Sequence, residues 1–538
     1  MRRLDRARDL SRDVGFLIPR RPRLAVALAA AQVSDSTDPM LLPALEVALG
    51  IRKTPGLLRR RALVLEKLGE LTAALHDWED LSLVDADSAV RERLLRGRII
   101  ELDLSWLPTN HHAPEPIQPA NTRRVLHIVK QAIPERWSGY TIRTLNSVRA
   151  QLEAGLEPIV ATDVVTGRDP RLPAAYTHAG IEHVRLARAP DYDAHAVPND
   201  LQLLDAVEAL VPIVREVRPA ILHAHSGHRG GEYALVALAL RERFGLPVVY
   251  EVRGLFEAVW TKDLERAERS ELFSMRVAQE TRIANAADHV IAISEALREE
   301  LVSRGVPRER ISVVPNGIEP TELVPVHRDA RLTKRLGLDG RFVVGYLGNL
   351  DHWREGIDVL IEALSVLRRR GRTDIAVLVV GDGKRRSELE AEARRFGVSE
   401  QCRFTGRVPH DSVNRYYAQM DLFVTPRVDE RAARYITPVK PFEAMALGLP
   451  LLVSDLPALR EIVDPPNRGR VAPAGEAMGL ATAIQTLSDD PAVRARIAAA
   501  GRQWVLAERT WASNGPRYRS VYDSVLGPRK ARVGIRTP

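Results

Sequence analysis

The chain has 538 residues, which is too long for one hydrophobic core and predicts two to four domains. Apolar residues make up 45% and charged residues 28%, a balance that excludes a disordered or fibrous chain. The single cysteine excludes a disulfide framework or a cysteine-built metal site within one chain.

The formal net charge is +8 and comes mainly from arginines that alternate with carboxylates, which we interpret chiefly as solvated helix faces. We expect no nucleic-acid partner. The remaining excess would favour phosphate-bearing ligands or an anionic membrane surface. No apolar run reaches the roughly 20 residues of a membrane span, and the N-terminus carries no apolar signal core, so we expect a cytoplasmic protein. The arginine-rich residues 1–23 leave open a peripheral contact with the inner face of the membrane.

Residues 1–106 carry apolar residues at three- and four-residue spacing and almost no strand pattern, which predicts an all-α region. In this region Leu42, Leu45 and Leu49 would share one helix face. Residues 69–78 resemble the turn and second helix of a tetratricopeptide hairpin, without a clear repeat of about 34 residues. Two roles stay open for these helices: binding a protein partner, or covering a face of the next domain.

Residues 107–122 hold four prolines and no periodicity, which predicts a linker. We interpret its adjacent His111 and His112 as solvent-exposed side chains and not as metal ligands. From residue 123 the pattern alternates between strand and helix, which is typical of parallel sheets with helical crossovers. We therefore predict an α/β fold of two tandem Rossmann-like domains, 123–320 and 321–506, followed by a helix at 507–528 and a tail at 529–538. The strands expected are 125–129, 158–162, 183–186, 221–224, 248–252, 289–293 and 312–314 in the first domain, and 342–347, 376–380, 403–405, 422–425, 451–454 and 471–472 in the second.

Polar residues follow several strands of the first domain. Gly139 stands where the first strand turns into a helix, so its backbone could approach a phosphate or form a tight turn. His223 and His225 face the same side of one strand. We expect His223 to be a packed core histidine and His225 to reach a polar substrate, and we do not favour a metal between them because no further ligand set is evident.

Charged residues also stand at or after the ends of later strands. Glu251 and Arg253 end a strand that starts apolar, so they face either a ligand cleft or each other in a salt bridge. In the second domain Gly348 ends a strand, Arg354 follows near a helix start and could reach a diphosphate, and Gly381 ends the next strand in a turn.

The segment Thr437–Pro450 gives the strongest signal. Pro438 and Pro441 set up a helix start, and Glu443 falls in the first turn, where the helix dipole favours a carboxylate. The dipole does not account for Lys440 in a chain with few lysines. A carboxylate at this place can bind a ribose diol, while Lys440 suits phosphates.

Taken in order, these motifs resemble the family-4 retaining glycosyltransferases of the GT-B fold, over roughly residues 124–526. The series includes Ser138-Gly139-Tyr140, His223-Ala224-His225, Pro315-Asn316-Gly317, Gly381-Asp382-Gly383, Glu443-Ala444-Met445-Ala446 and Arg509-Thr510-Trp511. The resemblance implies that the second domain binds a nucleotide sugar, that the first binds the acceptor, and that the last helix returns to the first domain. It also implies that neither a metal nor another cofactor is needed.

The resemblance assigns roles residue by residue. Catalytic candidates are His225, Lys440 and Arg354, and acceptor-side candidates are Glu251 and Arg253. Donor-binding candidates are Gly139, Tyr140, Gly348, Asn349, Gly381, Lys440 and Glu443. The chain departs from the family pattern at Tyr435, Asn349 and Glu355, where the family commonly has Glu, Arg and Lys. A subgroup of the family has Glu-Gly-hydrophobic-Asp at the place of Glu355, together with a Thr-Pro-x-Lys-Pro-x-Glu loop, and the chain looks like that subgroup.

The expected function is transfer of a sugar, with retention, from a nucleotide-sugar donor to a saccharide or lipid-linked acceptor in cell-surface polysaccharide or glycolipid synthesis. Two alternatives stay open. One is a nucleotide-sugar 2-epimerase with the same fold. The other is a catalytically inactive scaffold that acts through its helical domain, which the three departures motivate.

Overall fold

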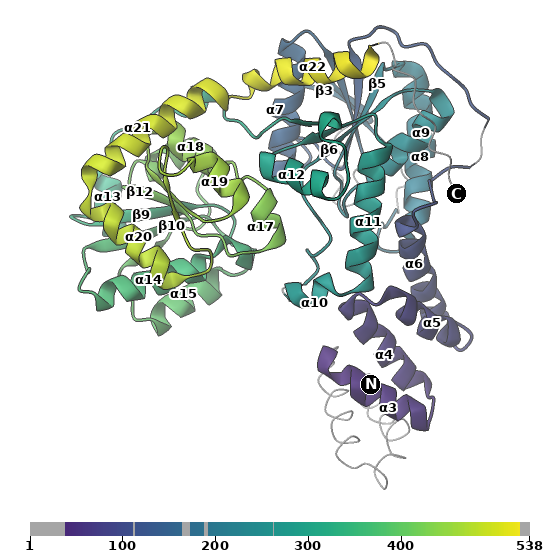
Figure 1. Cartoon of the computed structure of the whole chain (residues 1–538), viewed down its shortest axis with the longest axis horizontal. Helices are drawn as coiled ribbons and strands as arrows, with labels where there is room; N and C mark the ends of the chain where they lie inside the picture. Colours follow the sequence, from purple (N-terminus) through teal and green to yellow (C-terminus); the bar gives the residue numbers. More distant parts are fainter. Residues whose placement is uncertain (1–37, 111–112, 164–172, 188–191, 262, 528–538) are drawn as a thin grey trace.

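The computed structural model of the chain describes residues 38–110, 113–163, 173–187, 192–261 and 263–527 (Figure 1). The predictions made for residues 1–23, for His111 and His112, and for the tail at 529–538 lie outside these residues. The described chain forms a helical region followed by two α/β domains, as expected from the sequence. No helix in these ranges is both long enough and apolar enough to cross a membrane.

The helical region is built from helices with clear start and stop signals. In α4 (Pro55–Leu68), the Thr54 hydroxyl accepts a hydrogen bond from the Leu57 N–H, and Pro55 opens the first turn. Gly69 ends this helix at φ 83°, where an L side chain would be strained. Leucines from all the α-helices of this region form one core around Trp78. The elements are η2 (Pro39–Leu41), α3 (Leu42–Ile51), α4 (Pro55–Leu68), α5 (Leu71–Ser82) and α6 (Ala86–Leu102).

The proline-rich stretch after α6 runs along the first α/β domain. Its described residues form neither helix nor strand, but three of its N–H groups donate to carbonyls of that domain. Glu115 bonds Arg243 at 2.6 Å, and Ala120 bonds Arg218 at 2.8 Å. The stretch is therefore tied to the domain surface at several points.

The first α/β domain has an eight-stranded sheet in the order β3-β4-β2-β1-β5-β6-β7-β8. All seven predicted strands are present. The additional strand β3 pairs antiparallel with β4 at the edge of the sheet and has exposed residues, which explains why its pattern was missed. The strands are β1 (Arg124–Val129), β2 (Glu157–Thr162), β3 (Ala175–His178), β4 (Ile181–Arg185), β5 (Ile221–His225), β6 (Val248–Val252), β7 (His289–Ala292) and β8 (Ile311–Val313). The helices are α7 (Gly139–Glu153), α8 (Asn199–Val217), α9 (Glu232–Phe244), α10 (Leu264–Glu268), α11 (Glu271–Ala286) and α12 (Glu295–Ser303).

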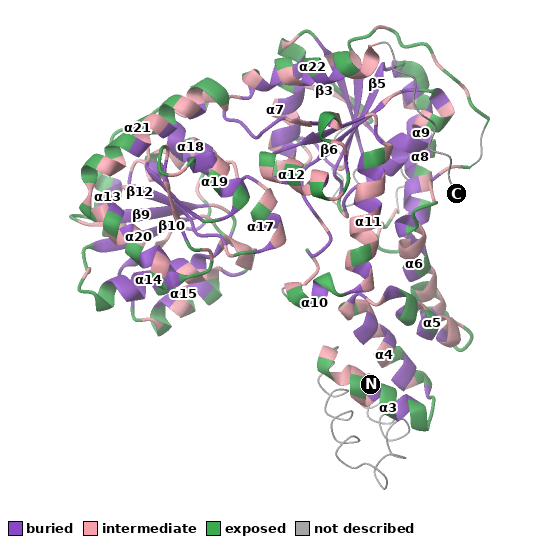
Figure 2. Cartoon of the chain, viewed as in Figure 1, coloured by how far each residue is buried: buried purple, intermediate pink, exposed green. Residues whose placement is uncertain are grey.

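The second domain has a six-stranded parallel sheet in the order β11-β10-β9-β12-β13-β14, and each strand was predicted. In both domains the strands are buried between helices that expose their outer faces (Figure 2). The strands are β9 (Phe342–Leu347), β10 (Ile375–Val380), β11 (Cys402–Phe404), β12 (Leu422–Thr425), β13 (Leu451–Ser454) and β14 (Arg470–Ala472). The helices are α13 (Ala330–Leu336), α14 (Ile357–Arg369), α15 (Arg386–Arg395), α16 (Val413–Tyr417), α17 (Arg431–Tyr435), α18 (Lys440–Ala446), α19 (Pro457–Val463), α20 (Ala477–Asp489) and α21 (Pro491–Glu508).

The final helix, α22 (Gly515–Leu526), returns to the first domain (Figure 1). Tyr518, Val521 and Tyr522 pack against the first sheet and are almost fully buried. This confirms the return of the chain that the resemblance implied.

Candidate active site

The chain passes between the two domains twice, near residues 317–318 and 509–511, and hydrogen bonds hold these two passages together. Ile318 donates to the Arg509 carbonyl at 2.8 Å and accepts from the Trp511 N–H at 3.0 Å. Between these bonds, a Cβ added to Gly317 would lie 2.9 Å from the carbonyl carbon of Thr510. Only glycine allows the two passages to lie this close, so the hinge is fixed by backbone packing.

Residues that follow strands of one sheet contact residues that follow a strand of the other. Ser294, just after β7, donates to the Tyr435 carbonyl at 2.5 Å. Asn316, just after β8, donates to the Thr437 carbonyl at 2.9 Å. The carboxyl ends of the parallel strands of both sheets therefore meet at one junction, which is the edge where open α/β sheets bind ligands.

On the second domain, Lys440 and Glu443 form an ion pair in the first turn of α18. The Lys440 Nζ lies 2.8 Å from Glu443 Oε1, and the Tyr417 hydroxyl donates to Glu443 Oε2 at 3.0 Å. Burial raises the pKa of the Tyr417 phenol well above its ordinary value, and the Glu443 carboxylate raises it further, so Tyr417 stays a donor. Phe442, which is buried in the domain core, fixes the turn from the opposite face.

A second ion cluster, centred on Glu355, lies nearby. Arg427 bonds both oxygens of Glu355 at 3.2 Å, and the Arg354 Nε lies 3.6 Å from Oε1. Burial alone would raise the pKa of Glu355, but the two guanidinium groups hold it below its usual value. The Tyr346 hydroxyl lies 3.4 Å from Glu355 and is close enough to Tyr417 to raise its pKa. The two clusters are therefore near enough to influence each other electrostatically.

Gly348 and Gly381, both predicted to bind the donor, lie against each other in the structure. A Cβ on Gly381, whose φ is 144°, would lie 1.9 Å from the carbonyl oxygen of Gly348. Asn349 donates to Asp351 at 3.0 Å and accepts from its N–H at 2.6 Å. Asn349 thus closes its own loop, where the family pattern has an arginine.

In the first domain, Gly139 opens α7 behind the Ser138 cap, and nothing lies within 4 Å of the position of an added Cβ. The next residue, Tyr140, has two cations near its ring. Lys130 Nζ lies 4.4 Å from the ring centroid, and the Arg253 guanidinium lies 4.5 Å from it. Gly139 is therefore an open backbone position beside a cationic group.

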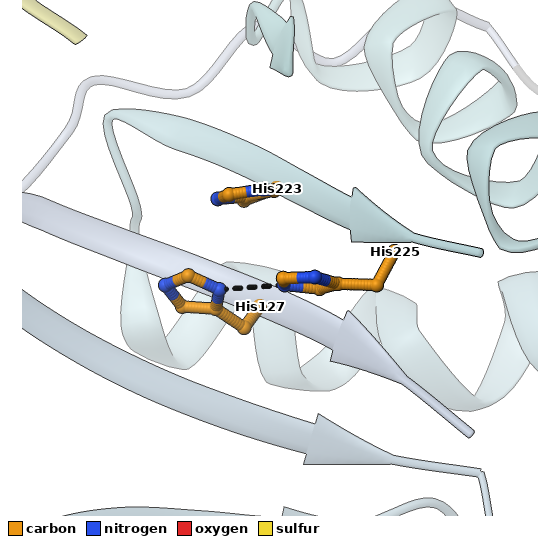
Figure 3. Close-up of side chains that lie close together, drawn as sticks. All are labelled: His127, His223 and His225. Atoms are coloured by element: carbon orange, nitrogen blue, oxygen red, sulfur yellow. Dashed lines mark hydrogen bonds between the residues drawn. The ribbon is translucent and has the colours of Figure 1, made fainter. Parts of the chain in front are cut away.

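Three histidines stack behind this turn (Figure 3). The Arg253 Nη2 lies 2.7 Å from His225 Nδ1, and since arginine only donates, that nitrogen is an acceptor. His225 Nε2 must then carry the proton and donate to His127 Nδ1 at 2.9 Å. By the same logic His127 Nε2 donates to Gln151 at 2.9 Å. The bonds fix the tautomers of His225 and His127.

This arrangement corrects the expected position of His225. The sequence predicted a side chain that reaches a substrate, but the ring is fully buried and both of its nitrogens are bonded. Burial, with help from Arg253, lowers the pKa of His225 to about 4, so the ring is neutral. His223 is also fully buried, as predicted.

The ring nitrogens of His127, His223 and His225 lie within 4.8 Å of one another. The rings of His223 and His225 are parallel within 13° at 4.3 Å, so their in-plane lone pairs do not converge on one point. His223 Nδ1 is bonded to the Tyr522 hydroxyl at 2.7 Å. This geometry does not fit a metal centre.

Glu251 and Arg253 are also more buried than expected for acceptor-side residues. Glu251 is fully buried and Arg253 is 8% exposed. Glu251 Oε1 accepts from Arg253 at 2.8 Å and from Arg143 at 3.0 Å, while Oε2 accepts from Tyr518 of α22 at 2.8 Å. The pair is thus a buried salt bridge, because Glu251 of β6 and Arg253, the first residue after β6, both contact the helices that cover this edge. Arg143 and Arg253 offset the burial of Glu251 and hold its pKa well below its usual range.

The buried network reaches the second domain through Asn316. Arg143 donates to Asn316 Oδ1 at 3.0 Å, which leaves the amide nitrogen to donate to Thr437. Thr437 is three residues before Lys440. A continuous path of hydrogen bonds therefore connects Glu251 to the loop just before α18, the helix that carries the Lys440–Glu443 pair.

Tyr435, at the place of the missing family glutamate, lies at the domain junction. The Tyr435 ring lies 5.7 Å from the guanidinium of Arg431, and Arg431 bonds Glu257 at 2.8 Å and Glu300 at 2.5 Å across the junction. At this position the chain has an interdomain contact where the family pattern has an acidic side chain.

The structure thus brings together Lys440, Glu443 and Arg354 on one side of the junction and Gly139, Tyr140 and Arg253 on the other. Sequence reasoning missed Arg427, although its position two residues after β12 was a signal of the kind used elsewhere. It also missed Arg143 and Tyr417, which lie inside helices and carry no motif.

Two family models match the chain. The model described as Glycosyl transferase 4-like domain matches residues 138–317, and the model described as Glycosyl transferases group 1 matches residues 341–490. The two matched ranges correspond to the two α/β domains. Together with the fold, they define the class of the chain: it has the two-domain GT-B fold, and each of its α/β domains matches a glycosyltransferase family.

Individual relatives agree with this class. A GDP-mannose-dependent alpha-mannosyltransferase of Mycolicibacterium smegmatis is 29% identical over 76% of this chain and 99% of its own length. A GDP-mannose-dependent alpha-(1-6)-phosphatidylinositol monomannoside mannosyltransferase of the same organism is 31% identical over 47% of this chain, and the match spans 65% of that relative. The fold resembles sucrose-phosphate synthase from Thermosynechococcus elongatus, with a TM-score of 0.60 and 22% identity over 75% of this chain and 99% of that one.

Proposed function

We propose that the chain transfers a hexose from a nucleotide-sugar donor to a saccharide or lipid-linked acceptor, with retention, in the synthesis of a cell-surface polysaccharide or glycolipid. GDP-mannose is the first donor to test, because both mycobacterial relatives above are named for it. The observation that carries the proposal is the presence of two charged clusters, Lys440–Glu443–Tyr417 and Arg354–Glu355–Arg427, at the ligand-binding edge of the second sheet.

In this proposal Glu443 accepts hydrogen bonds from the ribose diol of the donor. Lys440, Arg354 and Arg427 surround the diphosphate, and their positive charge stabilises it as it leaves the sugar. Glu355 orients the two guanidinium groups, which is a role for a carboxylate at a position where the family pattern has a lysine. No metal ion is needed in this scheme, because the leaving charge is neutralised by side chains.

His225 contributes through Arg253 in this proposal. Its Nδ1 accepts from the guanidinium that lies over Tyr140, beside the open backbone of Gly139. His225 is thus a positioning residue for the turn that faces the diphosphate, and catalysis depends on placement and charge. The 2-epimerase and the inactive scaffold are less favoured, since the matched families and the relatives named above are glycosyltransferases.

The test is to incubate the protein with GDP-mannose, UDP-glucose and their common analogues, in EDTA, with a lipid and saccharide extract as acceptor. Nucleotide release that depends on the extract, with a product whose anomeric proton coupling matches that of the donor, is expected. Binding of a nucleotide without release from any nucleotide sugar would favour the scaffold instead. A product of inverted configuration would exclude retention.

A further inference from the structure

A short segment of the second domain, residues 431–437, lies on the first domain. It runs from α17 into the loop before α18. Three successive backbone carbonyls of this segment accept hydrogen bonds, alternately from the first domain and from the donor side of the second. The donors are the Ser294 hydroxyl to Tyr435 at 2.5 Å, the Arg427 guanidinium to Ile436 at 2.9 Å, and the Asn316 amide to Thr437 at 2.9 Å. Arg427, which the proposed function places beside the diphosphate, is therefore anchored to the same stretch of backbone as the first domain.

The side chains of the segment also belong to the junction. Tyr435 and Ile436 pack against the hydrophobic core of the first domain. A Cβ on Gly254, just after β6, would lie 3.0 Å from Ile436 Cδ1, so the glycine leaves room for the isoleucine. The segment is thus held by its backbone and by its apolar side chains.

Four charged side chains close the junction beside this segment, and we call them the charge latch: Glu257, Glu300, Arg304 and Arg431. Arg431 of α17 bonds Glu257 Oε1 at 2.8 Å and Glu300 Oε1 at 2.5 Å. Arg304, at the end of α12, bonds the same two oxygens at 2.5 and 2.9 Å. All four side chains are largely buried.

Arg431 is the member of the latch that crosses the junction. In the first domain alone, the carboxylates of Glu257 and Glu300 share the single guanidinium of Arg304, which leaves one negative charge without a partner. Arg431 supplies the missing cation from the second domain. Burial alone would raise the pKa of Glu300, but the Tyr435 hydroxyl and the two guanidinium groups hold it below its usual value. Because an unbalanced buried carboxylate is costly, these charges favour contact between the domains.

Helix α11 brings two more charged groups to this side of the first domain. The Glu280 carboxylate accepts from the Tyr250 hydroxyl at 2.7 Å, and Arg276 donates to the Phe256 carbonyl at 2.5 Å. Within the residues that the structure describes, neither lies within ion-pair distance of a side chain of the charge latch. Arg276 therefore does not replace Arg431 as the partner of the two carboxylates.

The start of α12 makes a further contact with the second domain. Glu461 of α19 accepts from the first two N–H groups of α12 at 3.0 and 3.2 Å. Ser294, whose hydroxyl caps this helix, is also the donor to the Tyr435 carbonyl. Helix α12 therefore begins between α17 and α19 (Figure 1). Since Glu300 and Arg304 lie towards its other end, α12 is held to the second domain along its length.

We propose that Arg431 is a positioning residue for sugar transfer, which latches residues 431–437 onto the first domain and so holds the donor side in register with the acceptor side. Lys440 follows Arg431 by nine residues and begins the next helix, so a shift of the segment would move the donor groups with it. The inference rests on the proposed function, because it assigns a residue that positions the donor side for that reaction. Every group of the charge latch belongs to the chain itself, so we expect the domains to stay together whether or not a nucleotide is bound.

The test combines small-angle X-ray scattering of the full chain, with and without GDP or UDP, with kcat/KM for transfer. The variants are Arg431→Gln, Arg431→Lys, and the double variant Arg431→Gln with Glu300→Gln. Arg434→Gln is the matched control, because Arg434 lies on the same helix but bonds Asp429 of its own domain at 2.5 and 2.9 Å.

We expect the radius of gyration of the wild type and of Arg434→Gln to stay the same when nucleotide is added. Arg431→Gln should have a larger radius without nucleotide. Its kcat/KM should fall about tenfold or more, because the apparent activity scales with the fraction of molecules in the competent arrangement. Arg431→Lys keeps the charge but not the fork of donors, so its radius and its kcat/KM should lie between those of the wild type and Arg431→Gln.

The double variant separates the charge latch from a merely structural role. Once Arg431 is lost, removing the Glu300 carboxylate restores the balance between Glu257 and Arg304. The double variant should therefore recover part of the loss seen in Arg431→Gln, whereas two independent structural roles would add their losses.

Three results would overturn the inference. The first is an Arg431→Gln variant that keeps the radius of gyration or the kcat/KM of the wild type. The second is a wild type whose radius falls on nucleotide binding as much as that of Arg431→Gln. The third is additive losses in the double variant. If Arg431→Gln does not fold, Arg431→Lys and the single variant Glu300→Gln decide by the same measurements.

The radius of gyration also separates this inference from the proposed function. If the wild type consumes no nucleotide sugar but Arg431→Gln is expanded, the charge latch stands and the transfer function fails. If the wild type transfers sugar and Arg431→Gln transfers it equally well, the function stands and the positioning role fails.

Discussion

The bond from Asn316 to the Thr437 carbonyl gives the sharpest single-residue prediction. Asn316→Asp keeps the shape of the side chain and keeps an acceptor for Arg143, but a carboxylate cannot donate to the Thr437 carbonyl. The lost bond leaves a buried carbonyl unpaired next to a negative oxygen, which costs about 1–3 kcal/mol. Since about 1.4 kcal/mol is a factor of ten in affinity, we expect nucleotide affinity and kcat/KM to fall by about 5- to 140-fold.

The assay is calorimetric titration of the nucleotide product together with kcat/KM for the donor. Asn285→Asp is the matched control, because Asn285 also donates to a backbone carbonyl, at 3.0 Å, but on the exposed face of α11. A structural role alone would lower the melting temperature and leave nucleotide affinity unchanged. Nucleotide affinity within about twofold of the wild type in Asn316→Asp would refute the proposed link between the buried network and the donor loop.

Three further predictions test the hinge, the histidine network and the donor cluster. Gly317→Ala should destabilise the protein by about 1–3 kcal/mol, measured as a lower melting temperature, because the new methyl group would collide with the Thr510 backbone; an unchanged melting temperature would contradict the close crossing. His225 has a pKa near 4 in the fold and about 6.5 when unfolded, so its contribution to stability is complete above about pH 6.5 and is lost as the pH falls towards 4. His225→Gln should therefore flatten the fall of the urea midpoint across that range, and an equally steep fall would show that His225 does not carry it. Lys440→Gln should weaken binding of GDP or UDP about tenfold and leave binding of the nucleoside unchanged, whereas equal losses for both would place Lys440 away from the diphosphate.

Most of the fold could be predicted because its pattern is local. The alternation of apolar strands and helices is a short-range signal, and it located every strand except β3, which is short, exposed and antiparallel at an edge. The ion pair of Lys440 and Glu443 could also be predicted, because these residues are three positions apart in one helical turn behind a proline. In a helix, side chains three residues apart lie next to each other whatever the tertiary fold is.

The buried network could not be predicted in this way. Arg143 and Asn316 are separated by 173 residues, and Tyr518 reaches Glu251 from 267 residues away. The same limit hid the burial of His225, since α7 and α22 cover β5 only after the chain returns. The position of the helical region could not be predicted either, because Arg93 and Asp200, which hold it to the first domain, are 107 residues apart.

The most direct test of the central claim is calorimetric titration of GDP, UDP and ADP, in EDTA, into the wild type, Glu443→Gln and Glu400→Gln. Glu400 is exposed on the second domain and serves as the control. We expect one nucleotide to bind the wild type without added metal, Glu443→Gln to weaken that binding about tenfold or more through loss of the ribose contact, and Glu400→Gln to bind like the wild type. Equal affinity of the wild type and Glu443→Gln, or no nucleotide binding at all, would contradict it.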